Sequence, residues 1–195
     1  KNNFTNKFYE FYFNIENKTC SYQIIVIILK HYYSTKKIKN KINIQDIQNK
    51  LIEIYNKHPN KESLLYILYK NNKKSILEPL LKESFDIENF NKLLLSNDYY
   101  LTYIDIYLLS IEYNLPIILI CNTNIDLSIT DENYLICNKN NENNYYYFIK
   151  IPSKYSRDKL HNHKLLYFKD SIIFNINSNI INSKQNNLQD KILQD

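Results

Sequence analysis

The sequence contains 195 residues, of which 44% are hydrophobic and 23% are charged. A chain of this size can form one buried core, and nothing in its length requires a second domain. The formal net charge is +5, but the lysines are scattered among Asp and Glu, so we expect no nucleic acid partner.

Amino-acid usage is strongly skewed, with no Gly, no Met and no Trp but 19 Tyr. The missing residues have codons that contain G or C, whereas Asn, Lys, Ile and Tyr can be written with A and T alone. An AT-biased genome explains this skew better than selection for function. Because a complete reading frame starts with Met, we expect the chain to be an internal piece of a larger protein.

The cysteines and the apolar runs indicate the cellular setting. Cys20, Cys121 and Cys137 are an odd number and lie far apart, which favours a reducing compartment over a disulfide framework. The longest strictly apolar run, Ile24 to Leu29, is far shorter than the roughly 20 residues of a membrane-spanning helix. We therefore expect an intracellular protein with no membrane contact, and the sequence leaves its oligomeric state open.

The first half of the chain is predicted to be mainly helical. Residues 8–15 are aromatic and alternate loosely, which is typical of an edge strand. The apolar run from Tyr22 to Tyr33 favours a buried helix that Thr19 or Ser21 can cap, although its β-branched residues would also suit a buried strand. Apolar residues at helical spacing predict an amphipathic helix before the break at His58-Pro59, namely Ile44, Ile47, Leu51 and Ile54. Further helical segments are predicted at 63–70, around Pro79 and after Asp86.

The second half is predicted to be one helix followed by strands. Thr102 and Asp105 resemble a capping box, which predicts a helix that ends near Asn114 and carries its apolar face on Ile104, Leu108 and Ile111. Short apolar or aromatic segments then predict strands at 117–121, 134–137, 145–151, 165–168 and 172–176. We expect an α/β (α+β) domain over residues 1–176, with a helical layer on a small, mostly antiparallel sheet, and a polar linker over residues 177–195 that leads to a missing C-terminal region.

Cys20 is the clearest candidate for chemistry, because it lies at the start of the predicted buried helix. A helix N-terminus carries partial positive charge and unsatisfied N–H groups, which favour a thiolate and can form an oxyanion hole. The alternative is that Cys20 is only a small buried residue at a helix start.

The residues around Cys20 resemble a known motif. The segment NKTCSYQI, residues 17–24, resembles the aspartate-glycine-asparagine-cysteine motif of ovarian-tumour (OTU) family cysteine peptidases. The stretch from Asn97 to Ile120 resembles the helix of that family that leads into a core strand, with a YYLT-x-x-D-I-x-x-L pattern similar to OTU-like domains embedded in large proteins of giant DNA viruses. The resemblance implies a papain-like scaffold over roughly residues 17–151.

The sequence departs from the OTU pattern at two places. Asn17 and Lys18 stand where the family has aspartate and glycine, and the strand that corresponds to the family's histidine strand begins at Asn143 without a histidine. A thiol near its unperturbed pKa of about 8.5 is a poor catalyst without a base. His161 and His163 precede a predicted strand, so one of them can face Cys20, with Asn162 or Asp170 to orient it. The alternative is that both are surface residues of a polar loop.

Two functions follow from the resemblance. In the first, the domain is a deubiquitinase-like cysteine isopeptidase that acts on ubiquitin or a ubiquitin-like modifier through Cys20, with His163 or His161 as base and no cofactor. In the second, the scaffold has lost its base and is a catalytically silent structural or protein-binding module. A viral source would place either in the host cytoplasm or the virion. A zinc site built from Cys121, Cys137, His161 and His163 is a further alternative, although the sequence has no short paired-cysteine spacing.

Overall fold

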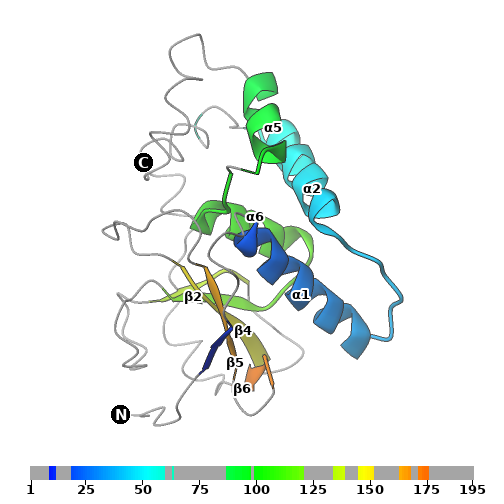
Figure 1. Ribbon diagram of the computed structural model, residues 1–195, viewed down its shortest axis with the longest axis vertical. Helices are drawn as coiled ribbons and strands as arrows, with labels where there is room; N and C mark the ends of the chain where they lie inside the picture. Colours follow the sequence, from blue (N-terminus) through cyan, green and yellow to red (C-terminus); the bar gives the residue numbers. More distant parts are fainter. Residues whose placement is uncertain are drawn as a thin grey trace.

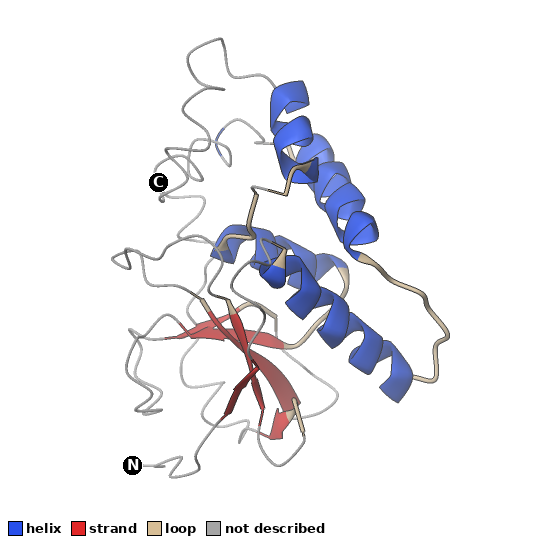
Figure 2. Cartoon of the chain, viewed as in Figure 1, coloured by secondary structure: helices blue, strands red, loops and turns tan. Residues whose placement is uncertain are grey.

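The computed structural model describes residues 9–11, 19–59, 63, 87–97, 99–120, 134–138, 145–151, 163–167 and 171–175. Within these ranges the chain combines helices with a mixed sheet, which confirms the predicted mixture of the two (Figure 1, Figure 2). The helices are α1 (Cys20–Thr35), α2 (Ile44–Lys57), α5 (Ile87–Leu95) and α6 (Tyr103–Glu112). The strands are β1 (Tyr9–Phe11), β2 (Ile117–Ile120), β3 (Tyr134–Ile136), β4 (Tyr145–Lys150), β5 (Lys164–Tyr167) and β6 (Phe174–Asn175).

Strand β4 occupies the middle of the sheet. The strand order is β1-β5-β4-β2-β3, and β6 pairs with β4 outside this path. β4 runs parallel to β2, whereas its pairs with β5 and β6 are antiparallel. Successive side chains of a strand point to opposite faces, and four consecutive residues of β4, Tyr146 to Ile149, are all buried. Both faces of β4 are therefore covered.

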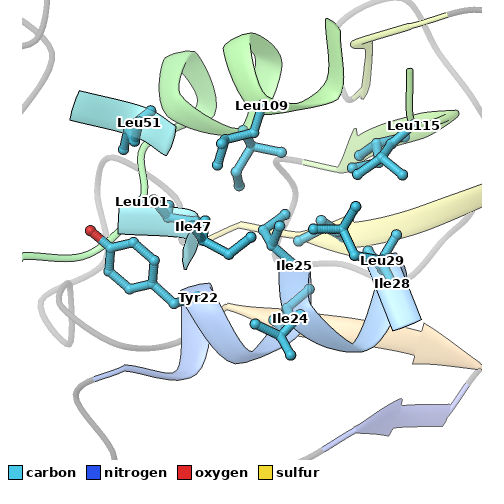
Figure 3. Close-up of a cluster of buried hydrophobic side chains, with 14 of the residues drawn as sticks. Tyr22, Ile24, Ile25, Ile28, Leu29, Ile47, Leu51, Leu101, Leu109 and Leu115 are labelled. Carbon is cyan, nitrogen blue, oxygen red and sulfur yellow. The ribbon is translucent and has the colours of Figure 1, made fainter. Parts of the chain in front are cut away.

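Helix α1 forms the centre of the core. It lies between the sheet and the pair formed by α2 and α5 (Figure 1). Ile25 and Leu29 lie on the side of α1 that faces Leu109 of α6 and Leu115 (Figure 3). Each fully buried Ile or Leu side chain stabilises the fold by about 1.5–3 kcal/mol. This burial stabilises the run as a helix despite its β-branched residues.

Helix α2 is amphipathic, as the spacing of its apolar residues predicted. Ile47, Leu51 and Tyr55 are completely buried. The helix begins with a capping box that the sequence analysis did not anticipate, in which Asn43 Oδ1 accepts the Asp46 N–H at 3.1 Å and Asp46 Oδ2 accepts the Asn43 N–H at 2.9 Å. Two otherwise unsatisfied backbone donors are thereby paired.

Helix α6 begins where its capping box predicted, but its buried face differs from the prediction. Ile104 is buried, whereas Ile111 is 51% exposed, so the expected face of Ile104, Leu108 and Ile111 is wrong. Apolar residues occur all round this helix, so its periodicity cannot identify the buried side, and packing against the other elements decides it. The helix ends near Asn114 as expected, since Asn114 adopts a φ of 52°.

Several predictions lie outside the described residues. They are the helix after Asn60, of which only Ser63 is described, the segment around Pro79, the capping role of Asp86 and the linker at 177–195. Among the described helices, none has the length and apolar content that crossing a membrane requires.

Candidate functional site

Cys20 is the first residue of α1, as predicted, and its side chain is 1% exposed. Thr19 is the N-cap residue, but its side chain makes no capping hydrogen bond, so the predicted capping role of Thr19 is wrong. Ser21 also fails to cap the helix, because it lies within the first turn. The backbone N–H groups of Cys20 and Ser21, at the start of α1, interact with the Cys20 sulfur.

His163 lies beside Cys20 in the folded chain. It immediately precedes β5, is 4% exposed, and its Nδ1 atom is shielded from solvent. Its backbone N–H lies within hydrogen-bonding range of the Cys20 sulfur, and α1 packs against β5. Sheet pairing thus carries His163 from a distant part of the sequence to the start of α1, and the expectation that it is a surface residue is wrong.

Burial dominates the electrostatics of Cys20. Loss of solvation raises the pKa of the thiol, and the backbone N–H groups of His163, Ser21 and Cys20 itself lower it by a smaller amount. The sequence analysis expected the helix N-terminus to favour the thiolate, and this expectation is wrong for the free protein. The N–H groups have the expected effect, but an apolar environment penalises a charged sulfur more strongly.

A short segment between α5 and α6 contacts both sides of this pair. Ser21, the neighbour of Cys20, accepts a hydrogen bond on its Oγ from the Leu101 N–H at 3.0 Å. The ring of Tyr100 lies beside the ring of His163, with centroids 6.2 Å apart and planes tilted by 51°. Both contacts are buried, since Ser21 and Tyr100 are 1% and 9% exposed.

The same segment is attached to a fully buried carboxylate, that of Asp105. Oδ1 of Asp105 accepts the Tyr55 hydroxyl at 2.7 Å, and Oδ2 accepts the Tyr99 hydroxyl at 2.9 Å and the Thr102 N–H at 2.6 Å. Burial, and after it the negative charge of Asp105, raise the pKa of both tyrosines well above its ordinary value. Asp105 was predicted as a capping residue, but its tyrosine partners were missed; the available signal was an acidic residue among the apolar residues of the first half of α6.

The remaining predicted site residues lie outside the described part of the chain. These are His161, the orienting candidates Asn162 and Asp170, the loop residues Asn17 and Lys18, and Cys121 of the zinc alternative. Among the residues that the structure describes, no group of three His, Cys, Asp or Glu side chains is arranged to hold a metal ion. The structure therefore brings together Cys20 and the backbone of His163, and it places Ser21 and Tyr100 next to them, with Asp105 bonded to the segment that carries Tyr100.

Comparison with known proteins adds no family to this picture. The sequence matches no protein-family model, and it has no match among curated proteins. The geometry around Cys20 is therefore what indicates a function for this chain. A buried thiol beside a histidine at the N-terminus of a helix can act as a nucleophile if the imidazole accepts its proton during attack.

Proposed function

We propose that this chain is an OTU-like cysteine peptidase-type domain of a larger, intracellular viral protein, in which Cys20 is the nucleophile and His163 is the base. Its substrate would be the C-terminal linkage of ubiquitin or a ubiquitin-like modifier. The observation that carries the proposal is the meeting of Cys20, at the start of the buried helix α1, with His163, directly before β5. The position of Cys20 at a helix start agrees with the resemblance, whereas His163 precedes β5 and does not lie on β4, the strand that corresponds to the family's histidine strand.

The raised thiol pKa affects how the proposed site would work. Burial raises the pKa of the Cys20 thiol, which in the free protein favours the neutral thiol over an ion pair with His163. The imidazole would take the thiol proton as the sulfur attacks the substrate carbonyl, and the N–H groups at the start of α1 would stabilise the developing negative charge. General-base assistance of this kind contributes about 10²- to 10⁴-fold to the rate.

The decisive experiment uses a ubiquitin probe with a thiol-reactive group at its C-terminus. The wild-type domain should be labelled, Cys20→Ala should not be labelled, and His163→Gln should be labelled at least about 100-fold more slowly at pH 7. Circular dichroism of each variant establishes that it is folded. Absence of labelling in a folded wild-type domain would rule out the enzyme.

A catalytically silent binding module is the second candidate, and the burial of Cys20 is the observation that favours it. A thiol with 1% exposure and a raised pKa resembles a structural cysteine. This function predicts that ubiquitin or another protein binds with equal affinity to the wild type and to Cys20→Ala, with no labelling of either. Titration calorimetry with both proteins measures this directly.

A further inference from the structure

Residues 99–102 form the last part of the connection from α5 to α6, and they alternate their contacts between two parts of the molecule. The side chains of Tyr99 and Thr102 bind the Asp105 carboxylate, Thr102 through its Oγ1 at 2.8 Å. Tyr100 lies against His163, and the backbone of Leu101 binds Ser21. We call residues 99–102 the bridging segment, because it contacts the neighbour of Cys20 and also the ring of His163.

The contact on the cysteine side fixes the start of α1. Ser21 follows Cys20 directly, and its hydroxyl oxygen accepts the Leu101 N–H inside the core. The next residue, Tyr22, donates its hydroxyl to the Leu94 carbonyl at the end of α5, at 3.2 Å. Of the two residues after Cys20, Ser21 is therefore tied to the bridging segment and Tyr22 to the end of α5, and both contacts restrict the position of the sulfur.

The contact on the histidine side limits the ring of His163. Two aromatic rings with centroids 6.2 Å apart lie within the usual range of about 4.5–7 Å for favourable pairs. Because both rings are buried, replacing Tyr100 by a smaller side chain would leave space into which the imidazole could rotate. The bulk of Tyr100 is thus suited to select one orientation of His163.

Asp105 holds the bridging segment in place. Its carboxylate receives hydrogen bonds from Tyr99 and Thr102 of the segment and from Tyr55 of α2. Hydrogen bonds to a buried charge are stronger than neutral ones, so this attachment is rigid compared with an ordinary loop contact. Tyr100 and Leu101 lie between two anchored residues.

We propose that Tyr100 is a positioning residue, whose ring holds the imidazole of His163 toward Cys20. The bridging segment also fixes the start of α1, and with it Cys20, through the bond between Leu101 and Ser21. This inference rests on the proposed function, since it assigns a role to Tyr100 in the same site. The ring supplies the effect, so phenylalanine should replace tyrosine and leucine should not.

The test is the pH dependence of Cys20 labelling by the ubiquitin probe between pH 5.5 and 9.5. If His163 is the base, the rate for the wild type shows a step in which it rises with pH as the imidazole loses its proton. Tyr100→Leu should remove this step and reduce the rate at pH 7 by about 10-fold or more, leaving a rate that rises only as the thiol ionises. Tyr100→Phe should restore the wild-type profile.

Tyr113→Leu is the matched control, because Tyr113 is a half-buried tyrosine at the C-terminal end of α6. It should lose stability while keeping the wild-type pH profile. A wild type without the histidine step would contradict the proposed function, and the role of Tyr100 would fail with it. A wild-type step that persists in Tyr100→Leu, or that also disappears in Tyr113→Leu, would overturn the positioning role alone.

Discussion

Asp105 is a buried aspartate, whereas Asp46, the other aspartate in the described residues, is exposed. It is 0% exposed, and both carboxylate oxygens accept hydrogen bonds. A buried carboxylate without partners would be strongly unfavourable, so the tyrosines on α2 and in the bridging segment are needed for this residue to be charged in the core. The arrangement links three parts of the chain through a single side chain.

Replacing this carboxylate by an amide should destabilise the protein. In Asp105→Asn, one oxygen becomes an NH₂ group that cannot accept the hydrogen bonds of Tyr99 and Thr102. We expect the free energy of unfolding, measured by urea denaturation, to fall by about 3 kcal/mol. Asp46→Asn, which alters the exposed capping box of α2, is the control and should cost less than about 1 kcal/mol. If both variants lost the same free energy of unfolding, the buried carboxylate of Asp105 would stabilise the protein no more than the exposed one of Asp46.

Cys20 should make the stability of the free protein depend on pH. Burial raises the pKa of the thiol in the folded state above its unfolded value of about 8.5. The folded state therefore retains this proton longer, so the stabilisation is fully present below about pH 8.5 and is lost as the pH rises through the folded pKa. Between pH 7 and 10, the free energy of unfolding of the wild type should decrease more steeply than that of Cys20→Ala.

Urea denaturation in the presence of a reducing agent measures both curves. The buried tyrosines also titrate at high pH, but they are the same in both proteins, so the difference between the curves isolates Cys20. Parallel curves would mean that the thiol has the same pKa in the folded and unfolded states.

At the scale of elements, the end of α6 determines how the chain enters the sheet. Asn114 follows the C-cap residue Tyr113 in a left-handed conformation with φ of 52°, and the Leu115 N–H returns to the Ser110 carbonyl at 2.8 Å. This turn directs the chain into Pro116 and β2. The Asn114 Oδ1 also accepts a hydrogen bond from Asn138 Nδ2 at 2.9 Å, which ties the turn to the residues after β3.

Substitution of Asn114 should separate these two effects. Asn114→Ala places an unsuited residue at positive φ and removes the bond to Asn138, and we expect a loss of about 2 kcal/mol. Asn114→Gly also removes the bond but relieves the backbone, so its loss should be about 1 kcal/mol smaller. Thermal or urea unfolding of both variants measures which of them is more stable. A glycine variant less stable than the alanine variant would contradict the expectation.

For the whole molecule, the sequence predicted the bounds of helices and strands more accurately than it predicted which residues contact one another. Helix α1 and strands β2 and β4 were predicted within about two residues of their ends, because apolar runs there are bounded by polar residues. The buried side of α6 could not be predicted, since its apolar residues surround the helix. Pairing of Cys20 with His163 was one of several alternatives, because it depends on how β5 joins the sheet. That contact also involves a backbone N–H, which no side-chain pattern reveals.

The tyrosines illustrate a second limit. Nineteen of them are spread along the chain, so composition gives no reason to choose Tyr55, Tyr99 or Tyr100. Their roles follow from placement against Asp105 and His163, which only the folded structure supplies. Where one residue type is this common, sequence patterns predict that it packs in the core. They cannot distinguish a tyrosine that contacts a functional residue from one that only fills space.

The separation of Cys20 and His163 along the chain has a consequence during translation. A ribosome makes α1 long before β5, so a growing chain contains the thiol without the histidine that completes the pair. Parallel pairing of β2 with β4, and the addition of β5 to β4, must come first, and such long-range contacts form slowly. The nucleophile proposed here would therefore remain inert on the nascent chain and would become competent only after most of the domain has left the ribosome.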